Sequence, residues 1–82
     1  MLNENLFLEF PDHFAFIYVQ ELRPGEWTSW VTFERKSDHA AKQTKIPGIR
    51  HGMQGIFPDK HEAIQAATAT ANRLIEHGEV GI

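Results

Sequence analysis

The sequence predicts a small α+β domain, in which antiparallel β-strands fill the first two-thirds of the chain and one C-terminal α-helix packs on the sheet. Aromatic and β-branched residues are concentrated before residue 35, in short runs separated by proline and glycine. Apolar residues at helical spacing begin only after residue 59. A chain of 82 residues has room for one domain, residues 1–82. Its 41% hydrophobic and 23% charged residues are typical of a soluble globular protein.

Three strands are predicted in the first part of the chain, at about residues 6–10, 14–22 and 27–35. Pro11 and Asp12 end the first of them. Residues 23–26, with the sequence RPGE, supply the turn between the other two. Proline presets φ at the second turn position, and glycine accepts a positive φ at the third. The second and third strands are therefore expected to form a β-hairpin.

The side chains of this hairpin can be assigned to two faces. If Arg23 and Glu26 close the turn, Leu22 lies opposite Trp27 and Tyr18 lies opposite Val31, and pleating places alternate residues on opposite faces. The face expected to form the core carries Phe14, Phe16, Tyr18, Leu22, Trp27, Val31 and Phe33. The second face carries Ala15, Ile17, Val19 and Trp30, together with Glu21, Thr28, Thr32 and Glu34.

The remaining chain predicts a loop, short strands and the helix. Residues 36–45 are polar and lack a period, which favours a loop. Glycine and proline interrupt the apolar residues of 46–57, which favours one or two short strands, in the same sheet or in a second small one. The helix is expected at about residues 59–77, with Asp59 and Glu62 forming an acidic capping box and Gly78 ending it. Its apolar face is expected on the face of the hairpin that contains Phe16 and Tyr18. That helical face consists of Ala63, Ile64, Ala67, Ala71, Leu74 and Ile75.

The half-apolar second face of the hairpin predicts a contact surface made of Ile17, Val19, Trp30 and Thr32. Exposed tryptophans in apolar patches are enriched where proteins bind each other. The alternative is that the N-terminal strand or the strands within 46–57 cover this face. We expect a non-catalytic protein-interaction or assembly module with a protein partner, and a homodimer is a further candidate.

Basic residues indicate an alternative function, binding of nucleic acid or another polyanion. Residues 35–60 contain six basic and two acidic residues, whereas the rest of the chain contains two basic and nine acidic ones. The net charge of −3 makes nucleic acid the less favoured partner. The expected anion contacts are Arg35, Lys36, Lys42, Lys45 and Arg50.

No motif indicates an enzyme, a metal or a cofactor, and none of these is expected. The five histidines have neither HxH nor HxxxH spacing, and a zinc site without cysteine would need scattered ligands to converge. Asp12 and His13 form the one local acid–histidine pair, and catalysis through them would need a nucleophile within hydrogen-bond reach. The glycines at 48, 52 and 55 do not match a phosphate-binding loop.

The longest apolar run, residues 14–19, is far shorter than a membrane span, so no membrane partner is expected. The first five residues lack the basic charge of a signal peptide. We therefore expect a cytoplasmic location.

Part of the sequence resembles the HicB family of antitoxins. The resemblance rests on the pair Pro47-Gly48 and on the run GIFPDKHEAI at residues 55–64, which is followed by alanines. It covers roughly a third of the chain, and the loop between Arg35 and Ile46 departs from the family pattern. The resemblance implies a small toxin protein as the partner. In size and in its lack of cysteine, the chain is also similar to small bacterial proteins encoded by prophages, which implies an accessory or assembly part of a phage-like system.

Overall fold

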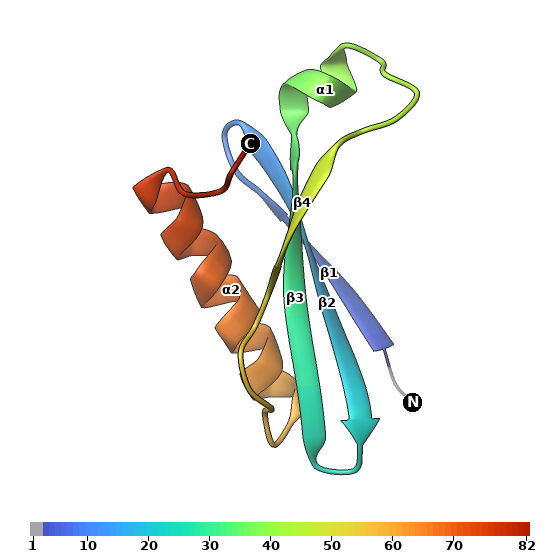
Figure 1. Cartoon of the computed structure of the whole chain (residues 1–82), viewed down its shortest axis with the longest axis vertical. Coiled ribbons are helices and arrows are strands. Elements are labelled where there is room, and N and C mark those ends of the chain that lie inside the picture. Colours follow the sequence, from blue (N-terminus) through green and yellow to red (C-terminus); the bar gives the residue numbers. More distant parts are fainter. Residues whose placement is uncertain (1–2) are drawn as a thin grey trace.

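The computed structural model describes residues 3–82 as a four-stranded antiparallel sheet with a long helix across one face (Figure 1). The strands are β1 (Asn3–Glu9), β2 (His13–Arg23), β3 (Glu26–Arg35) and β4 (Gly48–Gly52), and their spatial order is their order in the sequence. The helices are the short α1 (Lys36–Ala40) and the C-terminal α2 (Lys60–His77). The fold is therefore α+β, as the sequence predicts.

The segment between β3 and α2 differs from its expected structure in two places. Residues 36–40 form α1 rather than loop, and the Arg35 Nε donates to the Asp38 Oδ2 at 2.9 Å across this turn. The short strand within 46–57 is β4, which pairs with β3 and so extends the main sheet. Beyond β4, Phe57 forms an isolated bridge with Trp27, so this part of the chain also follows the edge of the sheet.

The register of the hairpin differs by one residue from the predicted register. Arg23 and Glu26 close the turn, and Gly25 has the expected positive φ of 79°. However, the register shifts between Glu21 and Arg23, so that Tyr18 lies opposite Trp30 instead of Val31. An extra residue in one strand moves every later pair by one position and thereby exchanges the two faces of that strand.

The core is consequently built from the other side chains of β2. The predicted core positions Phe14, Phe16 and Tyr18 are wrong, because they lie on the face opposite α2. The buried residues that face α2 are Ala15, Ile17 and Val19 from β2 and Trp27, Ser29, Val31 and Phe33 from β3.

Helix α2 has the predicted ends and packs closely on the sheet. The Asp59 side chain accepts a hydrogen bond from the Glu62 N–H at 2.8 Å, and Gly78 ends the helix with a φ of 65°. Three alanines at four-residue spacing are fully buried against β2 and β3, which allows a close approach of the helix backbone. At this contact the Ser29 hydroxyl donates to the Ala63 carbonyl at 2.8 Å.

The segment after α2 returns to the sheet and is held there by two histidines. The Nε2 atoms of His13 and His51 donate to the carbonyl oxygens of Ile82 and Val80, each at 2.9 Å. Val80 is buried, so this segment extends the core beyond the end of the helix.

Candidate interaction surface

The face of the sheet opposite α2, called the open face here, is rich in aromatic side chains. α2 lies on the other side, and α1 adjoins the open face only at the end of the sheet near Phe14 (Figure 1). A solvent-facing side of an antiparallel sheet is normally polar. The aromatic residues of the open face are Phe7 from β1, Phe14, Phe16 and Tyr18 from β2, and Trp30 from β3.

Tyr18, Trp30 and Arg50 form a stacked group, called the Trp30 stack here. The rings of Tyr18 and Trp30 are 5.7 Å apart between centroids, at an interplanar angle of 20°. The guanidinium carbon of Arg50 lies 5.0 Å from the centre of the Trp30 ring, which is a cation–π contact. Gly52, opposite Trp30 on β4, contributes no side chain and leaves space beside it. Three strands therefore present aromatic and cationic surface at one place.

The edge of the Trp30 ring has unused hydrogen-bonding capacity. Its Nε1 atom is buried and has no acceptor in the part of the chain that the structure describes. A buried donor without a partner is uncommon and costs free energy. A hollow of about 310 Å³ adjoins this position and is lined by Asn5, Tyr18, Val19, Gln20 and Trp30. A group that enters the hollow would therefore contact the rings of Tyr18 and Trp30.

At the end of the open face near α1, charged and polar side chains contact the Phe14 ring. The Lys36 Nζ lies 5.4 Å from the centre of the Phe14 ring and 2.6 Å from the Glu9 Oε2. His39 contacts the Phe14 ring edge-on, with a centroid distance of 5.1 Å, and its Nε2 hydrogen-bonds to Glu34 at 2.8 Å. Carboxylates and cations therefore lie on the same face, and several of them neutralise each other.

A separate group of phenyl rings lies toward the edge of the sheet. The Phe7 ring is 5.5 Å from Phe14 and 5.4 Å from Phe16 between centroids. Phe7 is 53% exposed, whereas its two neighbours are half-buried. Apolar surface therefore extends from the Trp30 stack to β1.

The predicted contact surface is divided between the two faces. Ile17 and Val19 are 0% and 1% exposed and lie beneath α2. Trp30 and Thr32 lie on the open face. The patch as predicted is wrong, because the register shift moves the β2 side chains to the other side. In its place the structure brings Trp30 next to Tyr18, which the sequence had suggested for the core.

The predicted anion contacts do not form one basic surface. Arg35 is paired with Asp38, and Lys36 is paired with Glu9. Arg50 lies over Trp30 on the open face. Lys42 and Lys45 are exposed in the connection between α1 and β4.

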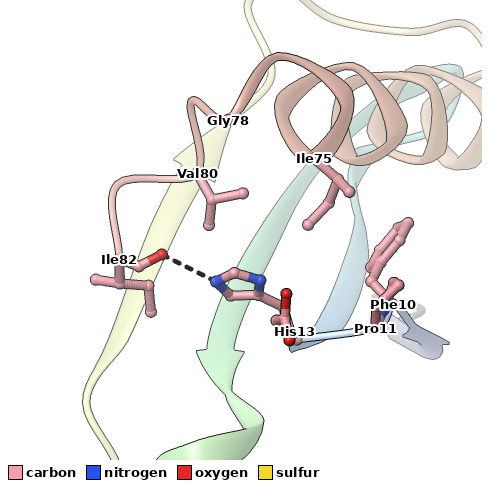
Figure 2. Close-up of a pocket in the computed structure, with 8 residues that line it drawn as sticks. Phe10, Pro11, His13, Ile75, Gly78, Val80 and Ile82 are labelled. Carbon is pink, nitrogen blue, oxygen red and sulfur yellow. Dashed lines mark hydrogen bonds between the residues drawn. The ribbon is translucent and has the colours of Figure 1, made fainter.

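The acid–histidine pair borders two hollows at the end of the sheet near α1. The first, of about 280 Å³, lies between His13, Ile75 and the C-terminal segment, with Phe10 on its far side (Figure 2). The second hollow has a volume of about 270 Å³, and Ser37 lines it together with Asp12 and His13. The His13 Nε2 donates to the Ile82 carbonyl, so a nucleophile activated by His13 would have to bond to the Nδ1 atom.

Among residues 3–82 there is no group of three or more histidine, aspartate and glutamate side chains placed to hold a metal ion. Within the same range no helix has both the length and the hydropathy to cross a membrane.

Comparisons with family models, curated proteins and solved structures found no match to this chain. The resemblance to HicB antitoxins and to prophage proteins therefore stays a prediction.

Proposed function

We propose that the protein is a non-catalytic protein-interaction module that binds a partner protein on the open face, with the Trp30 stack at the centre of the contact. The observation that carries this proposal is the uncovered group of Tyr18, Trp30 and Arg50. Tryptophan, tyrosine and arginine are the residue types that dominate binding free energy at protein interfaces.

The chemistry around the stack favours a protein over a nucleic acid. Glu9 and Glu34 lie on the same face as Arg50, and Lys36 is already paired. A surface with charges of both signs around an aromatic centre matches the polar rim and apolar middle of protein interfaces. The partner's apolar side chains can enter the hollow that Tyr18 and Trp30 line.

A second candidate function, binding of single-stranded nucleic acid, is supported by one observation. Aromatic rings on an open sheet with a guanidinium beside them form a platform on which bases can stack. The exposed Lys42 and Lys45 would then contact the phosphates. The net charge of −3 argues against this candidate.

Site-specific photo-cross-linking in the native cell identifies the partner. Thr28 lies on the open face beside the Trp30 stack, so a benzophenone amino acid at this position should capture the partner. The matched control carries the same probe at Gln65, which is exposed on α2 on the other side of the sheet. The protein captured at Thr28 and not at Gln65 is then produced in pure form for direct binding measurements.

The decisive measurement is the dissociation constant of that purified complex. Trp30→Ala should weaken it about 30-fold, which corresponds to the roughly 2 kcal/mol of an interface hot spot. Ile56→Ala is the matched control, because Ile56 is 57% exposed but lies outside the sheet. Circular dichroism confirms that both variants are folded. Equal affinity of the Trp30 variant and the wild type contradicts the proposal.

An oligothymidine titration tests the second candidate. Nucleic-acid binding predicts an affinity that falls steeply with salt, because neutralised phosphates release counterions. Salt-sensitive binding that is lost in both Trp30→Ala and Arg50→Ala would replace the protein-interaction proposal. Arg73→Ala is the control for charge alone, since Arg73 is exposed on α2.

A further inference from the structure

The outer edge of β1 exposes apolar side chains on both faces of the sheet. β1 lies at the edge of the sheet, and α2 makes its sheet contacts with β2 and β3. Leu6, on the α2 side, is 36% exposed, and Phe7, on the open face, is 53% exposed. Edge strands are normally protected from pairing by charged side chains, proline or short length. The carboxylate of Glu9 on β1 is already paired with Lys36. β4, at the other edge, has these protections, because it is short, follows Pro47 and contains Arg50.

Alternate backbone groups of β1 point away from the sheet. The Phe10 N–H donates to the His13 carbonyl at 2.9 Å, so these residues form a hydrogen-bonded pair between β1 and β2. Hydrogen-bonded pairs alternate along an antiparallel ladder, so Leu8 and Leu6 also direct their backbone groups to β2. The residues between them, including Phe7, direct their N–H and C=O groups to the free edge.

We propose that two copies of this chain pair antiparallel through β1, about a twofold axis beside Phe7. The strand is nearly palindromic about this residue, with Leu6 and Leu8 next to it and Asn5 and Glu9 beyond them. In this register Phe7 lies opposite Phe7 of the second copy, and Asn5 lies opposite Glu9. These are the residues whose backbone groups point outward, so each pair exchanges N–H···O bonds in both directions.

The side chains match in the same register. Leu6, which is 36% exposed, packs against Leu8 of the second copy on the α2 side. The Phe7 rings meet on the open face, and no like charges lie opposite each other among these pairs. A twofold axis requires such self-complementarity, because both copies contribute the same surface. A second copy therefore fits this edge better than an arbitrary extended peptide.

This pairing is independent of the proposed function. It adds strands in the plane of the sheet, so the Trp30 stack stays accessible on each copy. Failure to find a dimer would leave the open-face proposal intact, and failure of the open-face proposal would leave the dimer intact.

Sedimentation equilibrium tests the dimer. The wild-type protein should have twice the chain mass of 9.4 kDa. Phe7→Lys places like charges opposite each other and should give the single-chain mass with an unchanged circular dichroism spectrum. Leu22→Lys is the matched control and should remain dimeric, because Leu22 is 43% exposed and lies on β2. A wild type that is monomeric at every concentration, or a dimeric Phe7→Lys, overturns the proposal.

A second variant covers the case in which Phe7→Lys does not fold. Asn5→Pro removes a backbone N–H that points to the free edge, and it leaves the hydrogen bonds between β1 and β2 in place. It should therefore also give the single-chain mass, and a dimer in this variant overturns the proposal.

Disulfide trapping tests the register, since the chain contains no cysteine. Leu6 and Leu8 of the second copy form a non-hydrogen-bonded pair, whose Cα separation of about 4.5 Å is suitable for a disulfide. A mixture of Leu6→Cys and Leu8→Cys proteins should cross-link on oxidation, whereas neither variant should cross-link alone. Cross-linking of Leu6→Cys with itself would place the axis elsewhere and overturn the register centred on Phe7.

Discussion

Neighbouring residues of β2 should differ sharply in their contribution to stability, because they lie on opposite faces of the sheet. Ile17 is 0% exposed beneath α2. Truncation to alanine removes three carbons, or about 2.4 kcal/mol of transfer free energy at roughly 0.8 kcal/mol per buried carbon. The cavity that remains raises the expected cost of Ile17→Ala to about 3–4 kcal/mol. Phe16 is larger but half-buried on the open face, where water can replace the lost ring.

Phe16→Ala should therefore cost only about 1–1.5 kcal/mol, mainly its ring contact with Phe7. Urea denaturation followed by far-UV circular dichroism measures both variants. A domain of this size has a total stability of about 4–12 kcal/mol. At roughly 4–8 °C per kcal/mol, Ile17→Ala should also lower the melting temperature in thermal denaturation by more than about 12 °C. If Ile17→Ala unfolds the protein, Ile17→Val should still cost about 0.5–1.5 kcal/mol. A larger loss for Phe16→Ala than for Ile17→Ala would refute the register and, with it, the open face.

Three further substitutions test the packing of α2 and the segment after it, each by the same denaturation assay. Ala67→Leu should cost about 1–3 kcal/mol, because this fully buried alanine leaves no room for a longer side chain. Asp59→Ala should cost about 1 kcal/mol through loss of the hydrogen bond from the Glu62 N–H. Gly81→Ala should cost about 1–3 kcal/mol, because φ is 103° and the new Cβ would lie 2.6 Å from the Ile49 Cδ1.

A matched control shows whether α2 loses stability on any substitution of alanine by leucine or only at a buried position. Ala69 is exposed on α2, so Ala69→Leu should change stability by less than about 0.5 kcal/mol. Equal losses for the two leucine variants would mean that the alanine face of α2 does not pack on the sheet. An unchanged midpoint for Asp59→Ala or for Gly81→Ala would count against the cap or the positive φ, respectively.

The α+β class and most of the element positions could be predicted because they depend on local chemistry. The proline and glycine of residues 23–26 define the turn, and the capping residue Asp59 and Gly78 define the ends of the helix. The predicted core positions Trp27, Val31 and Phe33 of β3 are also buried. In each case a few neighbouring residues are enough to determine the backbone.

The register of β2 could not be predicted in the same way, because both of its faces are apolar. Residues 14–19 have the sequence FAFIYV, so the alternation of polar and apolar residues does not distinguish core from open face. The register shift at the turn decides between them, and it depends on the tertiary contact with α2. The buried alanines of α2 share the core with Ala15, Ile17 and Val19 of β2, and the aromatic rings of β2 lie on the other side of the sheet.

The candidate site was affected by the same ambiguity. The sequence predicts Trp30 on a solvent-facing contact surface, and in the structure Trp30 lies on the open face. The predicted neighbours of Trp30 on β2 are wrong, because the pairing of β2 with β3 differs by one residue from the predicted register. The position of Arg50 over Trp30 depends on the pairing of β3 with β4. The segment between them, residues 36–47, is too long for its sequence to define a register.

The order of the elements has a consequence for synthesis of the chain. Residues 3–52 complete the sheet, but α2, which covers Ile17 and its neighbours, follows at residues 60–77. A nascent chain therefore exposes apolar side chains on both faces of the sheet until the helix leaves the ribosome, and such intermediates aggregate readily. The carbonyl of Ile82 accepts a hydrogen bond from His13, 69 residues earlier, so this contact also requires the segment after α2. The protein should accordingly fold to completion only after translation has passed α2, and chaperones should bind it before that point.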